Sequence, residues 1–348
     1  MTTLLAGDIG GTKTLLALYA LQDDGLEVLA SERFVSSEWS DLAPMVQRFL
    51  ASQGPGEGTV DWPQAACLAV AGPVRAGSAS LTNLPWRLQA SELGAATRIR
   101  HLELVNDFAV LVYGLPHLQE HQRACLRPGT ADPAAPMLIL GAGTGLGVAI
   151  GVAGAAGLEA IASEAGHGEF AARSDSEWRL RQWLLADLQL ERLSIERVVS
   201  GTGLGHLARW LLHEHHPAGD HPLQRPGIDD LPAAVAGAAA EGDALARRAL
   251  DLWLGAYGSV AGDLALATLS RGGVWLAGGT AGKLLAELRG GPFLEAFGAK
   301  GRLAPVLDPL PITAITDPAI GLFSAACRAR MLLASAPMGA PMGARMGD

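Results

Sequence analysis

The stretch that decides the fold is LLAGDIGGTKT, residues 4–14. Apolar residues lead into Asp8, two glycines follow at positions 10 and 11, and a second apolar run spans residues 15–21. Short apolar runs on either side of a glycine turn predict two strands joined by a tight connection. Glycine also lets a ligand approach the backbone closely. The segment therefore predicts a hairpin whose turn presents backbone N–H groups.

A second copy of this plan lies farther along the chain. MLIL at 137–140 leads into GAGTGLG at 141–147 and then into the apolar run 148–152. Residues 137–158 carry no charge, and that length could span a membrane. Glycines recur throughout this stretch, however, and would weaken a helix at almost every turn. We therefore expect two more strands, no membrane span, and a chain that arose by duplication.

The remaining segments alternate between strand and helix patterns. Strands are expected at 65–70, 102–105 and 274–277, and apolar spacing predicts helices at 41–50, 178–188, 203–213, 231–241 and 244–269. Another helix is expected to follow Gly278, Gly279 and Thr280. The tail from Ser335 repeats Ala-Pro-Met-Gly and is expected to be disordered. Alternation of strands and helices predicts α/β layers.

Composition narrows the class of protein. The chain has 348 residues, 49% hydrophobic, with a net charge of −9, which indicates a globular protein of about two domains. The negative charge gives no general attraction for nucleic acids or anionic membranes. The three cysteines form no CxxC pair, and no signal peptide is visible at the N-terminus. We expect a cytoplasmic protein with small-molecule partners.

The glycine turns fail the two commonest nucleotide-binding templates. The P-loop pattern would need glycine at position 12, which is Thr12. The dinucleotide pattern would need glycine at Leu146 or at His206. These two classes are therefore disfavoured, although the turns still suit anions.

Two carboxylates stand at predicted strand ends. Asp8 lies beside the first glycine turn, where a carboxylate can hold a hydrated Mg²⁺, or where it can form an Asx-turn. Asp107 follows Asn106 and can accept a proton from a substrate hydroxyl that attacks phosphorus. It can equally cap a helix that begins at Phe108. Both alternatives stay open on the residues alone.

Two histidine-containing segments carry further polar groups. EAGHGE at 164–169 suits a flexible loop that reaches sugar hydroxyls, or a solvated loop without a function. HEHH at 213–216 lacks the second histidine of the HExxH zinc pattern because Pro217 occupies that position. We interpret it as a frayed helix end.

In this order the motifs resemble bacterial glucokinases of the ATP-dependent, non-ROK type, in the actin-like, sugar kinase and heat-shock ATPase superfamily. Residues 6–13 resemble the family's first phosphate motif, 141–147 its second and 276–280 its adenosine motif. The more specific motifs are LTNLPW at 81–86, VNDF at 105–108, SEAGH at 163–167 and SIERVVSG at 194–201. The resemblance spans residues 4–332, with Ala165 where the family usually has glycine. The cysteine-rich zinc motif of ROK kinases is absent from the sequence.

The resemblance implies roles for individual residues. Asp107 would be the catalytic base, and the sugar would bind to Asn83, Asn106, Asp107, Glu164, His167 and Glu196. ATP would bind to Asp8, Gly10, Gly11, Thr12, Lys13, Gly143, Thr144, Gly145, Gly201, Gly278 and Gly279. Mg²⁺ would be held by Asp8 through water.

The resemblance also implies an architecture and an activity. The fold would be α/β, a two-lobed actin-like ATPase (ribonuclease H-like) fold with a cleft between the lobes, usually as a homodimer. A small lobe would span 1–115 and a large lobe 116–334, with the last helix free to return to the small lobe and 335–348 disordered. The enzyme would transfer the γ-phosphate of ATP to the C6 hydroxyl of glucose. Alternatives are a kinase for another hexose or amino sugar, and a non-catalytic sugar-sensing regulator.

Overall fold

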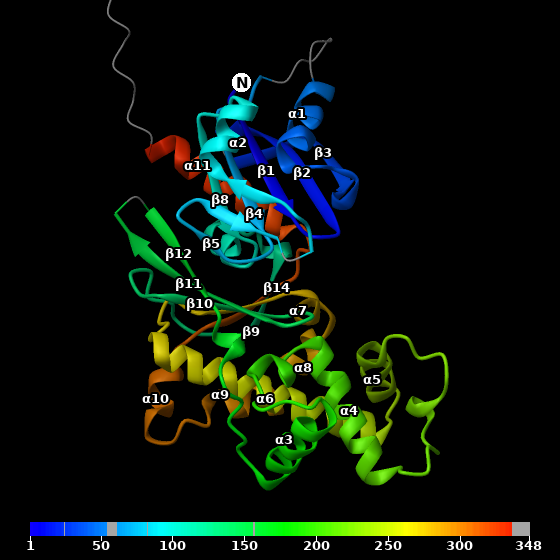
Figure 1. Ribbon diagram of the computed structural model, residues 1–348. Helices are drawn as coiled ribbons and strands as arrows, with labels where there is room; N and C mark the ends of the chain where they lie inside the picture. The colour runs from blue at the N-terminus through cyan, green and yellow to red at the C-terminus, as the bar shows by residue number, and fades with distance from the viewer. Residues whose placement is uncertain (24, 54–60, 82, 156, 336–348) are drawn as a thin grey trace, which may run out of the picture. The chain divides into compact units, whose positions relative to one another are not determined.

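The computed structural model describes residues 1–23, 25–53, 61–81, 83–155 and 157–335. The chain divides into two compact units (Figure 1). The first comprises residues 1–116, 154–157 and 319–348, and the second comprises 117–153 and 158–318. The last helix, Ile320–Ser335, therefore belongs to the first unit and not to the 116–334 segment. Ser335 ends this helix, so the predicted disordered tail is wrong for that residue, and the rest of the tail lies outside the described residues.

The first unit is built on a five-stranded sheet in the order β3-β2-β1-β4-β8. The strands are β1 (Thr3–Ile9), β2 (Lys13–Gln22), β3 (Gly25–Val35), β4 (Ala65–Val70) and β8 (His101–Asn106). The first three form an antiparallel meander, and β4 and β8 run parallel to β1. The hairpin predicted from residues 4–14 is confirmed, and so are the strands at 65–70 and 102–105. Parallel alignment brings the carboxyl ends of β1, β4 and β8 to one edge of the sheet.

Helices cover the two faces of this sheet. One face packs on α1 (Leu42–Ser52) and α2 (Ala90–Thr97), with Phe49 and Leu68 in the shared core. The helix α11 (Ile320–Ser335), drawn in red in Figure 1, packs on β1 and β4. Its contact side is lined with small buried residues such as Ala325 and Ala329, which allow the helix to approach closely. A small sheet of β5 (Val74–Arg75), β6 (Ser78–Ser80) and β7 (Arg87–Gln89) completes the unit.

The second unit repeats this plan. Its six-stranded sheet has the order β12-β11-β10-β13-β14-β9, in which β12, β11 and β10 correspond to the meander of the first unit and β13 and β14 run parallel to β10. The strands are β9 (Arg123–Arg127), β10 (Met137–Ala142), β11 (Leu146–Gly154), β12 (Gly157–Ser163), β13 (Val274–Ala277) and β14 (Ile312–Ile315). The charge-free stretch thus forms two strands, as predicted. No helix in the described residues is long and apolar enough to span a membrane.

Helices make up most of the second unit. The expected helices are present as α3 (Asp175–Asp187), α4 (Gly201–His215), α5 (Leu231–Ala240), α6 (Ala244–Thr268) and α7 (Gly279–Lys283). Shorter ones follow as α8 (Leu285–Leu288), α9 (Gly291–Gly298) and α10 (Ala304–Leu307). Short 3₁₀ helices lie at Ser36–Glu38, Ala109–His117, Glu120–Gln122, Ala165–His167, Ile195–Arg197, Pro222–Gln224 and Gly301–Leu303. The core of the unit lies around α4 and α6, where Trp210, Trp253 and Tyr257 are fully buried.

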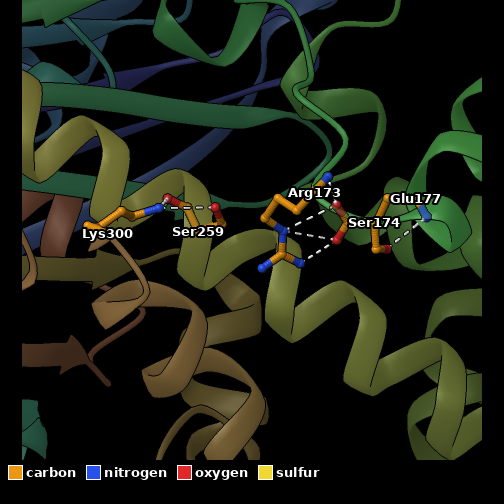
Figure 2. Close-up of polar contacts among 5 residues, drawn as sticks. All are labelled: Arg173, Ser174, Glu177, Ser259 and Lys300. Atoms are coloured by element: carbon orange, nitrogen blue, oxygen red, sulfur yellow. Dashed lines mark hydrogen bonds and ion pairs between the residues drawn. The ribbon is translucent and has the colours of Figure 1, made fainter. Parts of the chain in front are cut away.

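Glycines on α6 allow its neighbours to pack tightly. A Cβ added at Gly258 would clash with the carbonyl oxygen of Phe293 on α9. The ammonium of Lys300, just after α9, donates to the carbonyl of Ser259 at 2.9 Å and to its hydroxyl at 3.1 Å (Figure 2). Arg173 lies against the same helix, with a guanidinium nitrogen 3.1 Å from the position of a Cβ added at Gly255. These contacts pack α9, Lys300 and Arg173 closely against α6.

Candidate active site

The first glycine turn is held in shape from two sides. The N–H of Gly10 donates to the carbonyl of Lys13 at 3.0 Å. Ser36, at the end of β3, donates its hydroxyl to the Gly10 carbonyl at 2.8 Å and its N–H to the Thr12 carbonyl at 3.1 Å. Ser36 is fully buried, and sequence reasoning missed it because a serine after a strand carries no recognisable signal. The turn that would meet phosphate is therefore pre-organised.

Asn83 lies against this turn. A Cβ added at Gly11 would stand 3.2 Å from the Cβ of Asn83. The predicted sugar-binding asparagine and the predicted phosphate-binding turn are thus neighbours within the first unit. Only glycine at position 11 leaves room for this approach without a shift of Asn83.

Asp8 and Asp107 are neighbouring carboxylates at the carboxyl ends of β1 and β8. The Asp107 residue is exposed on the surface. The atoms packed around its carboxyl group nevertheless displace much of the water that would solvate the charge. That desolvation is the largest cause that raises the pKa of Asp107 to about 6, and the negative charge of Asp8 adds to it. Desolvation likewise raises the pKa of Asp8, against the attraction of Lys13. A carboxylate with a pKa near neutrality is suited to accept a proton.

The cap predicted as an alternative role for Asp107 is shared with its neighbour, because the Phe108 N–H also hydrogen-bonds to the Asp107 carboxylate. The side-chain carbonyl of Asn106 accepts the N–H groups of Phe108 at 3.1 Å and Ala109 at 3.0 Å. The segment that follows is a 3₁₀ helix, Ala109–His117, whereas the cap interpretation assumed a helix from residue 108. Beside Asp8, the N–H of Gly10, which an Asx-turn would direct at the Asp8 carboxylate, donates to the Lys13 carbonyl at 3.0 Å.

The residues around Asp8 fit a magnesium ion. Carboxylate oxygens are hard ligands, and Mg²⁺ typically takes one or two of them together with water and substrate phosphates. Asp8 and Asp107 supply two such groups, and a cation would offset the repulsion that the Asp8 charge exerts on Asp107. The described residues contain no cluster of three or more acidic, histidine or cysteine side chains that could enclose a metal alone. The pair therefore suits a metal that arrives with a nucleotide.

The second glycine turn is tied to the start of α4. The Gly143 N–H donates to the Gly145 carbonyl at 2.9 Å. The N–H of Gly201, the first residue of α4, donates to the Gly143 carbonyl at 2.7 Å, and the hydroxyl of Thr202 donates to the Thr144 carbonyl at 3.1 Å. The turn and the positive end of a helix thus lie together, an arrangement that favours anions.

A cavity of about 400 Å³ opens at this place in the second unit. It is lined by Ala142, Gly143, Thr144, Gly201, Thr202, Leu204, Asp230, Pro232, Ala233, Ala236, Trp253, Gly279, Thr280, Lys283 and Leu284. The hydroxyl of Thr280 donates to the Ala142 carbonyl at 2.6 Å, and Gly278 has a positive φ of 83° that suits glycine. Four predicted nucleotide residues thus share one cavity. Sequence reasoning missed the charged groups of Asp230 and Lys283, which belong to no motif.

Three predicted sugar residues meet in the second unit. His167 Nε2 lies 3.7 Å from a carboxylate oxygen of Glu164, and its Nδ1 lies 3.5 Å from a carboxylate oxygen of Glu196. Glu196 also lies over the second turn, because a Cβ added at Gly145 would come within 2.5 Å of its Oε2. The distant motif that contains Glu196 is thereby brought to the loop at 164–169. A histidine between two carboxylates offers donors and acceptors to hydroxyl groups.

The predicted residues therefore form two groups, one in each unit. Asp8, Gly10, Gly11, Thr12, Lys13, Asn83, Asn106 and Asp107 belong to the first unit, and Gly143, Thr144, Gly145, Glu164, His167, Glu196, Gly201, Gly278 and Gly279 belong to the second. The histidines at 213–216 close α4, and His216 pairs with Asp220 at 3.0 Å. That pairing agrees with a helix end.

Comparison with known proteins identifies the family and the fold. The glucokinase family model matches residues 5–332. Glucokinases of Nostoc punctiforme and a Synechocystis species are 38% and 39% identical, over 95% and 92% of this chain and 100% and 96% of theirs. The crystal structure of a glucokinase from an Antarctic psychrotroph has a TM-score of 0.81 and 30% identity, and the match covers 95% of this chain and 99% of that one. The expected fold is confirmed.

Proposed function

The chain belongs to the glucokinase family, and on that premise we propose that it phosphorylates glucose at the C6 hydroxyl with ATP. The products are glucose 6-phosphate and ADP. The observation that carries the catalytic part of the proposal is the Asp107 carboxylate, whose pKa is raised to about 6 by desolvation and by Asp8.

Asp107 acts as the general base in this proposal. It accepts the proton of the C6 hydroxyl while that oxygen forms its bond to the γ-phosphorus and the bond from phosphorus to the bridging oxygen of ADP breaks. A pKa near 6 leaves the group ionised at neutral pH and still basic enough to hold the proton in transit. Asn106 fixes the orientation of the carboxylate through its amide, which donates to Asp107 at 3.0 Å.

The glycine turns and the cavity account for nucleotide binding. We assign ATP binding to Gly143, Thr144, Gly145, Gly201, Gly278 and Gly279, and contacts with its terminal phosphates to Gly10, Gly11, Thr12 and Lys13. The start of α4 supplies a positive dipole end to the phosphates, and the apolar walls at Leu204 and Leu284 suit a purine. Mg²⁺, held by Asp8 through water, would neutralise charge on the phosphates.

Polar side chains account for the sugar. We assign the hydroxyl contacts to Asn83, Asn106, Glu164, His167 and Glu196. Carboxylates and amides accept and donate to hydroxyls with a fixed geometry, so they discriminate among hexoses by position. We further propose a cytoplasmic homodimer, as the family resemblance implies.

A coupled assay of ADP release across hexoses tests the proposal. With ATP and Mg²⁺ present, glucose should give the highest kcat/KM, and mannose and glucosamine should be poorer substrates. Turnover on another hexose in place of glucose would move the assignment to a different sugar kinase. An absence of turnover on every sugar, with glucose binding still measurable by calorimetry, would favour the sugar-sensing regulator.

A further inference from the structure

The loop that carries Glu164 and His167 is fastened by ion pairs that the proposed reaction does not use. Glu169 accepts a hydrogen bond from Arg181 Nη2 at 2.9 Å and another from Arg192 Nε at 3.3 Å. The Nη2 atom of Arg192 donates to the backbone carbonyl of His167 at 2.6 Å. A single guanidinium group thus joins the Glu169 carboxylate to the backbone of His167.

The same loop is paired with the segment that carries Glu196. Glu169 and Ser194 form an antiparallel bridge. The N–H of Ile195 donates to the Gly168 carbonyl at 2.8 Å, and the N–H of Phe170 donates to the Leu193 carbonyl at 2.8 Å. Arg192 lies at the start of this paired segment and Glu196 near its end. The bridge therefore governs the spacing between His167 and Glu196.

Helix α3 supports the loop at two points, one helical turn apart. Arg181 of α3 holds Glu169, and Glu177 of α3 holds Arg173, the residue just before the Ser174 cap (Figure 2). Glu177 is buried, and it accepts both the Arg173 backbone N–H at 2.7 Å and the Arg173 guanidinium. Between these points Phe170 is buried in the core. The contacts with α3 thus hold the part of the loop near Arg173, and Arg192 holds the part near His167.

The ion pair between Glu169 and Arg192 is too exposed to serve stability alone. The side chains of Glu169 and Arg192 are 46% and 58% exposed, and exposed pairs contribute little to folding. Their hydrogen bonds nevertheless lower the pKa of Glu169, Arg181 contributing most and Arg192 next. Glu169 therefore stays ionised at neutral pH. What the pairs control is the position of the His167 backbone.

We propose that Glu169 and Arg192 are positioning residues for sugar binding, which hold His167 and Glu196 at the spacing that the hydroxyl groups of the hexose require. This inference rests on the proposed function. Neither residue touches the sugar. Arg192 acts through the His167 carbonyl, and Glu169 acts by orienting Arg192.

Two conservative variants test the inference. Glu169→Gln keeps the size of the side chain but removes its charge, and Arg192→Lys cannot reach Glu169 and the His167 carbonyl at once. For each we expect the KM for glucose and the calorimetric Kd for glucose without ATP to rise about tenfold, with kcat, the KM for ATP and Tm little changed. Both changes break the same bridge. The KM for glucose of the double variant should therefore be no higher than that of the more affected single variant.

The control is Asp251→Asn, which breaks a comparable arginine pair in the same unit. Asp251 accepts from Arg247 at 2.8 Å and 3.0 Å on α6, and its change should leave the KM for glucose unaltered. An unchanged KM in Glu169→Gln and Arg192→Lys, in an enzyme that phosphorylates glucose, would overturn this inference and leave the proposed function intact. An equal rise in Asp251→Asn would also overturn it. A wild-type enzyme without turnover on any sugar would defeat the proposed function itself.

Discussion

The Asn106 amide donates to the Asp107 carboxylate at 3.0 Å, and the carbonyl of the same side chain accepts the N–H groups of Phe108 and Ala109. Asn106 thus orients its neighbour and contributes to the cap. The Phe108 N–H also hydrogen-bonds to the Asp107 carboxylate and lowers its pKa, so Asp107 shares the capping role that its place in the sequence suggests. Its carboxylate is held at the end of β8 with Asp8 as a charged neighbour.

Asp107→Asn should lower kcat about 10²-fold or more, since general-base catalysis typically contributes that much. The amide keeps the shape of the side chain, so the Kd for glucose should change little. Coupled ADP release at saturating glucose and ATP measures the first quantity, and calorimetry measures the second. Turnover near the wild-type level would show that Asp107 is not the base.

The same variant should raise Tm near neutral pH in metal-free buffer. The pKa of Asp107 is raised from 3.8 to about 6 in the folded protein, so the folded state holds this proton more tightly than the unfolded state does. Stability is therefore lost as the pH rises from about 4 to about 6, and the ionised carboxylate costs stability above that range. Thermal melts of wild type and Asp107→Asn should diverge as the pH rises through this window. Curves that stay parallel would contradict the raised pKa.

Gly145→Ala should weaken glucose binding without unfolding the protein. The added methyl group would meet the Glu196 carboxylate at 2.5 Å, and a flexible side chain can move away from it. We therefore expect a several-fold higher KM for glucose with Tm changed by little, because the displaced group is a proposed sugar contact and not part of the core. A KM for glucose equal to that of wild type would argue against a role for Glu196.

Gly258→Ala and Gly237→Ala should shift stability in opposite directions. At Gly258 on α6 the methyl group would clash with the backbone carbonyl of Phe293, so we expect a loss of about 1–3 kcal/mol or more from overpacking. At Gly237 on α5 nothing lies within 4 Å, and alanine should add roughly 0.5–1 kcal/mol through helix propensity. Denaturant unfolding of each variant measures its change in the free energy of unfolding. Equal effects would mean that α6 and α9 do not pack as closely as described.

Much of the fold could be predicted because its local signals are strong. The hairpins at both glycine turns, the strand at 65–70 and the long helix α6 follow directly from apolar runs and their spacing. The edge strands β3 and β9 are not predicted from the sequence. Their exposed faces are polar, so neither strand contains a continuous apolar run. The sequence does not predict that α11 packs on the first unit. The spacing of apolar residues shows which face of a helix is buried, but it does not show which sheet that face packs against.

The sequence predicts candidate site residues only where they stand in a recognisable motif. Asp107, Glu164 and His167 stand in short polar motifs between apolar runs, so they could be found. Ser36 and Arg192 could not, because each acts on a backbone carbonyl whose neighbour is set by tertiary structure. Side chains that support a site from behind carry no pattern of their own in one sequence.

The return of α11 to β1 and β4 also constrains the order of events during synthesis. The first unit combines residues 1–116 with the helix at 320–335, whereas the second consists of residues 117–153 and 158–318 between them. When the first 116 residues have left the ribosome, the side of the sheet that carries Cys67 still lacks the helix that supplies Arg328, the partner of Glu103. Until the last helix is translated, the apolar face of β1 and β4 that it covers has no partner, and exposed apolar surface of this kind promotes aggregation.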